Sequence, residues 1–263
     1  MSHTLAFGDD HSPGADIAWQ WISAHQWPGW SLEIVTAEPP DDMRPVEGRD
    51  ARLHPWEPED PRDPEGTGFD AVVNLRAAID PRLALIEKPW DLVTIGPRGA
   101  GKLKSLHLGS TADWLLRQPV SPLILAGQKD PVRRVLVATD GSMHARRAVH
   151  TLATLPWREG VAVHVVTVAE RRFDSDSALN DATDALSGSG VDLVDAVVRQ
   201  GRPTHVIVDE VEAVDPDLIV MGARGHGRIR RLVVGSTAAT IAGSLDRSLL
   251  VAQATEDEEP TDS

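Results

Sequence analysis

Two glycine-rich segments with the same spacing hold the residues best suited to bind a ligand. In the second segment, Gly222 and Gly225 follow an apolar run, and Gly235-Ser236-Thr237 comes after nine intervening residues. Glycine lets backbone or ligand approach closely, and Gly225 is expected to adopt a positive φ. A helix that begins at Ser236 would offer backbone N–H groups and hydroxyls to a phosphate. The pattern predicts an anion site, although a plain turn and an ordinary N-cap at Ser236 remain open.

The charge of this segment favours an anionic ligand. No acid lies from residue 222 to 235, whereas the same stretch has four arginines: Arg224, Arg228, Arg230 and Arg231. The whole chain has a net charge of −14. A local concentration of positive charge in such a chain indicates that the segment attracts a negatively charged molecule.

The first segment repeats the pattern 126 residues earlier, as Gly96, Gly99, Gly109 and Ser110. Its residues 96–102 also match a P-loop through the lysine of that motif. Leu103 stands where a P-loop needs Ser or Thr to bind Mg²⁺, so we reject that interpretation.

An acidic turn precedes each glycine segment. Asp10 lies in Asp9-Asp10-His11-Ser12, and Asp140 lies in Thr139-Asp140-Gly141-Ser142, 130 residues later. Ligands of open α/β sheets lie beyond the carboxyl ends of the strands, which is where Asp140 and Gly222 both fall. Asp140 is therefore a candidate ligand-binding residue.

The elements that must position these residues alternate in type. In the second half we expect strands at 135–139, 161–168, 193–198, 218–221 and 249–251, and helices at 145–155, 178–186, 205–214 and 236–245. This rhythm predicts a parallel sheet with helices on both faces. We expect two domains, 1–128 and 132–253, followed by a disordered acidic tail at 254–263.

The first half departs from the second at residues 38–67. Seven prolines between 39 and 64 exclude a helix there, and we expect a mobile acidic insertion. The last strands of the two halves, 123–125 and 249–251, are short and apolar. Left as open edges they would invite aggregation, so we expect them to pair and to join the halves as an internal pseudo-dimer.

Composition excludes several classes of function. The chain has no cysteine, which excludes disulfides and thiolate sites. Its negative charge disfavours binding to nucleic acid or anionic membranes. No apolar run reaches the length of a membrane span and the start does not resemble a signal peptide, so we expect a cytoplasmic protein. The ten histidines lack metal-ligand spacing, and no nucleophile elbow occurs.

Taken together, the Gly-x2-Gly-x9-Gly-Ser pattern, the Asp-x-Ser turns and the Leu218–Gly222 strand resemble the ATP-binding branch of the universal stress protein family. The resemblance implies two tandem Rossmann-like domains of the adenine nucleotide α-hydrolase type, each an open parallel five-stranded sheet. It implies ATP, with Mg²⁺, as the ligand. Asp10 and Asp140 would lie at the adenosine end, and the backbone of Ala37 or Val168 would meet adenine. The glycines and hydroxyls would hold ribose and phosphates: Gly96, Gly99, Gly109, Ser110, Gly222, Gly225, Gly235, Ser236 and Thr237.

Three functions remain open at this stage. A regulatory nucleotide-binding protein without enzymatic activity is the leading hypothesis. A slow ATPase or self-phosphorylating enzyme is the second, although no general base is evident beside the motif. The third is a nucleotide-free interaction scaffold, and a homodimer of the chain is compatible with each. We also expect His11 and Pro97, which replace Gly141 and Ala223, to make the first site weaker than the second.

Overall fold

The structure is a computed structural model of the 263-residue chain. It describes residues 3–37, 52–77, 79–98, 108–117, 120–169, 174–225, 236–244 and 246–254.

In the described parts of the first half, strands and helices alternate around a parallel core. The elements are β1 (His3–Gly8), α1 (Pro13–Ser23), β2 (Trp30–Ala37), β3 (His54–Pro55), β4 (Ala71–Ala77), α2 (Pro81–Ala84), β5 (Leu92–Ile95), α3 (Ser110–Arg117) and β6 (Leu123–Leu125). Five of the strands are parallel and lie in the order β4-β2-β1-β5-β6. The two-residue β3 pairs antiparallel with β4 at the edge.

The second half follows the predicted alternation, and every end lies within three residues of its predicted position. Its elements are β7 (Arg134–Ala138), α4 (Met143–Thr154), β8 (Ala162–Val168), α5 (Ser175–Leu186), β9 (Asp192–Arg199), α6 (Pro203–Val214), β10 (Leu218–Gly222), α7 (Ser236–Ser244) and β11 (Ser248–Ala252). The strands form the same parallel order, β11-β10-β7-β8-β9. The predicted fold class is therefore confirmed.

The two halves share one continuous sheet. The last strands pair antiparallel, with Leu249 opposite Leu125 and Val251 opposite Leu123, so the predicted pairing of these strands is confirmed. Because strands run parallel within each half and antiparallel across this junction, the carboxyl ends of the two sets of strands lie at opposite edges of the sheet. The two candidate sites are therefore separate.

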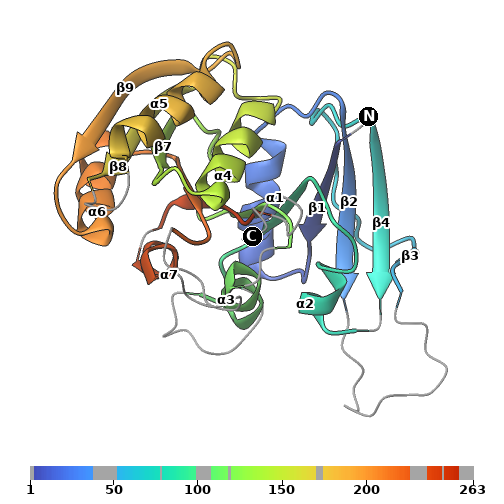
Figure 1. Ribbon diagram of the computed structural model, residues 1–263. Coiled ribbons are helices and arrows are strands. Elements are labelled where there is room, and N and C mark those ends of the chain that lie inside the picture. The colour runs from blue at the N-terminus through green and yellow to red at the C-terminus, as the bar shows by residue number, and fades with distance from the viewer. Residues whose placement is uncertain are drawn as a thin grey trace, which may run out of the picture.

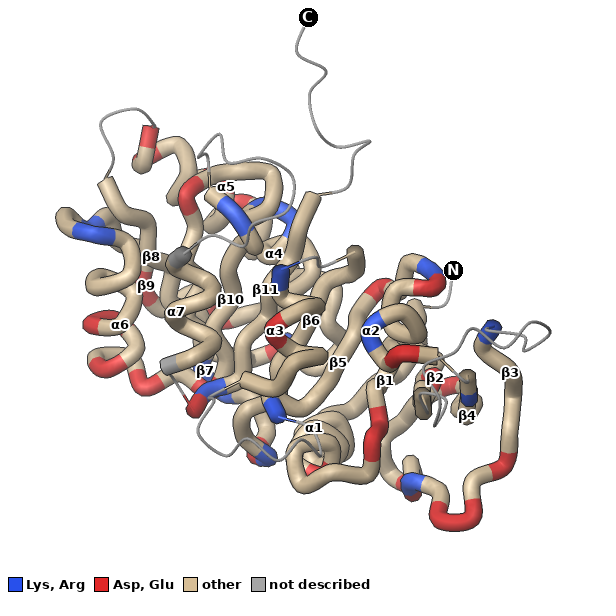
Figure 2. The backbone as a smooth tube through the Cα atoms, turned by 90° about the horizontal axis from the view of Figure 1, so that it is seen from below, with Lys and Arg blue, Asp and Glu red and all other residues tan. Residues whose placement is uncertain are grey.

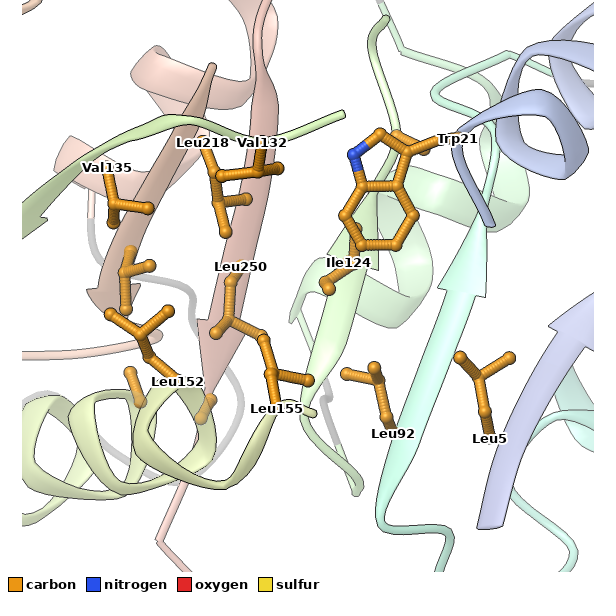
Figure 3. Packing of buried hydrophobic residues seen from close by; sticks show 14 of the residues in the cluster. Leu5, Trp21, Leu92, Ile124, Val132, Val135, Leu152, Leu155, Leu218 and Leu250 are labelled. Atoms are coloured by element: carbon orange, nitrogen blue, oxygen red, sulfur yellow. The ribbon is translucent and has the colours of Figure 1, made fainter. Parts of the chain in front are cut away.

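Helices cover both faces of the sheet. One hydrophobic cluster packs α1, α4 and α5 on one face, and a second packs α2, α3, α6 and α7 on the other. Figure 1 shows α1 and α4 near the centre of the molecule, between β1, β2 and β4 on one side and α5, α6 and β9 on the other. Figure 3 shows that the first cluster runs across the junction, from Leu5 and Leu92 to Leu218 and Leu250. The halves thus have a common core.

Two acids lie at the amino ends of the strands and have structural partners. Asp91 Oδ2 accepts a hydrogen bond from the Thr4 backbone N–H at 2.7 Å. Asp217 Oδ2 accepts from the backbone N–H groups of Arg133 and Arg134, both at 2.9 Å. These bonds fix the starts of β1 and β7.

The predicted mobile insertion needs a correction in its described part, residues 52–67, which we call the strap. No helix forms there, as predicted, but the strap lies against the first half. The backbone N–H of Trp56 donates to Asn74 O at 3.1 Å, and Trp27 N–H donates to Thr67 O at 2.8 Å. Proline excludes a helix but not an extended packed chain. Residues 38–51 lie outside the described residues.

The strap takes the place that α5 has in the second half. Arg62 of the strap donates from Nη1 to Asp16 Oδ1 on α1 at 2.7 Å. In the second half, Arg146 on α4 donates to Asp181 Oδ2 on α5 at 2.6 Å. Residues 16 and 146 are equivalent positions, 130 residues apart. The same tie between the first helix and its covering segment is therefore present in both halves with its charges exchanged.

Within the described helices, none is long and apolar enough to cross a membrane.

Candidate functional site

The predicted residues of the second half meet where the order of its strands reverses. β7 and β10 are paired neighbours, and their chains continue in opposite directions across the sheet. The Asp140 turn follows β7 directly, and Gly222 is the last residue of β10. Ligands of open α/β sheets bind at such reversal points, beyond the carboxyl ends of the strands.

Hydrogen bonds within the Asp140 turn fix its shape. The Gly141 N–H donates to Thr139 Oγ1 at 3.2 Å, and the Ser142 N–H donates to Asp140 Oδ1 at 3.0 Å. Ser142 then caps α4, because its Oγ accepts from the Ala145 N–H at 3.3 Å. The same Oγ donates to Arg224 O at 3.2 Å. This last bond ties the acidic turn to the glycine segment.

The two described glycines of the segment are required by space rather than by backbone conformation. A Cβ on Gly222 would lie 2.6 Å from Ala145 N, so the start of α4 packs directly on this residue. A Cβ on Gly225 would lie 2.5 Å from Asp140 Oδ2. The predicted positive φ of Gly225 is wrong, since Gly225 is not among the glycines with positive φ. The glycine instead leaves room for the Asp140 carboxylate beside the loop.

Two helix starts meet at the same carboxyl edge of the sheet. Thr204 in the first turn of α6 and Thr237 in the first turn of α7 have their Oγ1 atoms 3.4 Å apart. Within the described residues around the start of α6, the N-cap Arg202 makes no side-chain capping bond, so the first N–H groups of this helix have no side-chain acceptor. Helix starts with such donors favour negative charge. Thr204 was not named by the sequence analysis.

The remaining predicted residues of the second half are only partly described. Val168 ends β8 as predicted, and its carbonyl accepts from Ser175 Oγ at 3.3 Å. Gly235 and residues 226–234 lie outside the described residues, and Ser236 is described only as the first residue of α7. Of the predicted site residues of the second half, the structure therefore describes Asp140, Val168, Gly222, Gly225 and Thr237.

The first half builds the same turn with a different residue at its tip. Ser12 caps α1 by accepting from the Ala15 N–H at 3.2 Å, and the Ser12 N–H donates to Asp10 Oδ1 at 3.1 Å. His11 has a φ of 54°, and its counterpart Gly141 has a φ of 75°. A Cβ on Gly141 would lie 2.8 Å from the Ala178 Cβ of α5. The first half has the strap instead of α5, which leaves room for the His11 side chain.

This difference predicts unequal effects of alanine at the two tips. Gly141→Ala is expected to lower the free energy of unfolding by about 2 kcal/mol, from left-handed backbone strain and from contact with α5. Residue 11 already has a Cβ in this conformation, so His11→Ala should change the free energy of unfolding by under about 1 kcal/mol. Urea unfolding of both variants measures the difference, and equal losses would contradict the role of α5.

The glycine segment of the first half is packed on α1. A Cβ on Gly96 would lie 2.2 Å from Gly14 O, and a Cβ on Gly14 would lie 1.7 Å from Arg98 O. The Gly109 N–H donates to Pro97 O at 2.8 Å, and Ser110 begins α3 in an exposed position. Ala37 ends β2 as predicted. Gly99 lies outside the described residues.

Asp9, next to Asp10, is the buried acid of the first half. Its side chain is 1% exposed, and it accepts from Arg62 Nε at 2.7 Å and Nη2 at 2.8 Å. Burial raises the pKa of Asp9, but the bonds from Arg62 and from the His11 N–H outweigh burial and hold that pKa below its usual value. The bond to Asp9 in turn raises the pKa of Arg62. Both groups therefore stay charged at neutral pH.

Known proteins resemble the chain in sequence and in fold. The family model described as "Universal stress protein family" matches residues 131–253. A universal stress protein of Thermus aquaticus is 31% identical over 120 residues, which cover 40% of this chain and 86% of that protein. One of Synechocystis sp. is 32% identical over 157 residues, covering 58% of this chain but only 54% of that protein. The crystal structure of a universal stress protein from Archaeoglobus fulgidus covers 96% of this chain and 99% of that one, with a TM-score of 0.67 and 19% identity.

Proposed function

The chain belongs to the universal stress protein family, and we propose that it binds ATP at the site of its second half. In this proposal the protein acts as a regulatory nucleotide-binding protein and not as an enzyme. Mg²⁺ would bind with the nucleotide, because this ion usually binds through substrate phosphates and one or two carboxylates.

The observation that carries the proposal is the contact between the acidic turn and the glycine loop. Asp140 Oδ2 lies 2.5 Å from the place that a Cβ of residue 225 would take, and Ser142 Oγ donates to Arg224 O at 3.2 Å. These two segments are more than 80 residues apart in sequence, yet both lie at the carboxyl edge of the sheet. The starts of α6 and α7 meet at the same edge of the sheet, where they would supply donors for phosphate oxygens. The arrangement combines a carboxylate suited to ribose hydroxyls with an anion-binding end.

A substitution at Gly225 tests the site with little cost to the fold. Gly225 is exposed and has no positive φ, so the cost of Gly225→Val to stability should be limited to the shift of the Asp140 carboxylate and its bond from the Ser142 N–H. Its side chain would displace the Asp140 carboxylate and crowd the loop, and the affinity for Mg²⁺-ATP should fall more than tenfold. Calorimetry of wild type and variant measures this. Unchanged affinity would refute the assignment of the site.

Two further measurements distinguish the proposed function from the alternatives. Nucleotide released from the purified, denatured protein and identified by chromatography would separate a nucleotide-binding protein from a nucleotide-free scaffold. Turnover of radiolabelled ATP by the intact chain would separate a binding protein from a slow ATPase. Hydrolysis that disappears in Gly225→Val together with binding would replace the proposed regulatory function by the enzymatic one.

A further inference from the structure

The first half repeats the fold of the second, but its own groups fill several positions that a ligand would use. The clearest case is Gly109, the glycine expected to donate its N–H to a phosphate. That N–H donates to Pro97 O at 2.8 Å instead. This donor is therefore already bound within the chain.

The helix that follows β4, the third parallel strand of the first half, also differs from its counterpart in the second half. α2 is a single turn of four residues, and its N-cap Asp80 accepts from the Arg82 N–H at 2.9 Å. The Arg82 guanidinium also pairs with Asp80. In the second half the same position, directly before a proline, is held by Arg202, which makes no side-chain capping bond to the twelve-residue α6. Where the second half has a cation and uncapped N–H groups, the first half has a paired carboxylate.

The strap adds a third difference, at the carboxyl end of β1. Arg62 binds Asp9 through two nitrogens and Asp16 through a third. Thr139, a neutral residue, holds the position of Asp9 in the second half. The connection between β3 and β4 is otherwise acidic along much of its length, as Figure 2 shows. It carries six acids and Arg62 as its one basic residue: Glu57, Glu59, Asp60, Asp63, Glu65 and Asp70. This surface repels phosphate groups.

We infer that the chain binds one nucleotide, in its second half. In the first half, residues of the chain itself, including the strap, occupy the corresponding positions. This inference rests on the proposed function. Three independent parts of the first half carry it: the Gly109–Pro97 bond, the Asp80 cap and the Arg62 contacts. In the first two, a backbone N–H at a loop or helix start is bound within the chain. In the third, the strap is held on Asp9, next to Asp10.

Saturation binding of radiolabelled Mg²⁺-ATP to the full chain tests the inference. Equilibrium dialysis is expected to give one ATP per chain. Thr237→Val removes a hydroxyl at the start of α7 and should weaken binding at least tenfold, since a hydrogen bond to a charged group is lost. Its matched control is Thr111→Val, at the equivalent position of α3, which should bind as the wild type does. Circular dichroism of both variants verifies that each is folded.

The outcomes are distinguishable. Two ATP molecules per chain, or a tenfold loss in Thr111→Val, would overturn the inference and leave the proposed function in place. Absence of bound ATP in the wild type would overturn the proposed function and the inference together. One ATP per chain that is lost in Thr237→Val and retained in Thr111→Val supports both.

Discussion

Replacing Arg62 by Met is expected to lower the free energy of unfolding by about 3 kcal/mol, because removal of one member of a buried ion pair leaves an unpaired charge. The Asp9 side chain is 1% exposed, and Arg62 holds it by two bonds of 2.7 and 2.8 Å. The Arg62 guanidinium is the strap's link to both Asp9 and Asp16. Its loss should therefore also release this part of the strap. Urea unfolding at pH 7 measures the change in stability.

A second variant separates the buried charge from the loss of side-chain packing. Thr139 occupies the position of Asp9 in the second half. Its Oγ1 accepts from the Gly141 N–H, as Asp9 Oδ1 accepts from the His11 N–H. Asp9→Thr combined with Arg62→Met removes both charges and keeps this turn. The double variant should recover most of the 3 kcal/mol that the single variant loses. A double variant as unstable as Arg62→Met would show that the buried charge is not the cause.

The matched control is the charge-exchanged pair of the second half. Arg146 and Asp181 have side chains that are 61% and 43% exposed. Exposed ion pairs contribute little, so Arg146→Met should cost under about 1 kcal/mol. The comparison tests whether burial of Asp9, rather than the tie between helix and covering segment, makes Arg62 important.

Much of the second half could be predicted because each of its elements has a clear pattern. The apolar β-branched strands, such as β7 and β10, are buried on both faces, and their runs are easily separated from helical spacing. The pairing of β6 with β11 followed from two apolar strands that would otherwise be open edges. These are local properties of short segments, or a simple consequence of their repetition.

The strap could not be predicted in the same way. Its extended chain has no periodicity, and its tie to α1 joins Arg62 to Asp16 across 46 residues. The equivalent tie in the second half has the opposite order of charges, so comparison of the two halves does not reveal it either. Proline density correctly excluded a helix at the strap. It gave no information on whether the extended chain packs on the sheet.

The sequence indicated that Asp140 and the glycine segment lie at the same edge of the sheet, but not why residue 225 is glycine. Asp140 and Gly225 were both named from motif spacing, and the structure brings them together. The positive φ assigned to Gly225 was wrong, because the need for glycine comes from the Asp140 side chain, which is remote in sequence. Thr204 was missed because it meets Thr237 only through the packing of α6 beside α7. Spacing within one segment cannot show a contact between two segments.

A buried histidine joins the two halves and makes their stability dependent on pH. His25 follows α1 and is 4% exposed, and it packs among Trp21, Trp27 and Trp157, the last of which belongs to the second half. Its Nε2 accepts from the Val132 N–H at 2.9 Å, and its Nδ1 is 2.7 Å from Trp21 O. A carbonyl can only accept and a backbone N–H can only donate. The ring is therefore neutral, with its proton on Nδ1.

Protonation of His25 would place two N–H donors against each other in an apolar site. Burial lowers the pKa of His25 to about 4, against an ordinary value of 6.5, although the bond to Trp21 O acts in the opposite direction. Between pH 6.5 and 4 the unfolded chain binds a proton at this residue and the folded chain does not. The stability that neutral His25 contributes above pH 6.5 is therefore lost as the pH falls to 4, by about 3 kcal/mol.

His25→Gln separates the titration of His25 from that of other groups, because the Gln side-chain amide offers both a donor and an acceptor and stays uncharged in this pH range. Urea unfolding at several pH values from 7 to 4 should show the wild type losing about 3 kcal/mol more than the variant. His150→Gln, at an exposed position on α4, is the control and should follow the wild type. Parallel losses in the wild type and His25→Gln would mean that His25 takes up its proton in the folded protein as readily as in the unfolded chain. The junction of the two halves would then tolerate a charged ring, contrary to the bond from Val132.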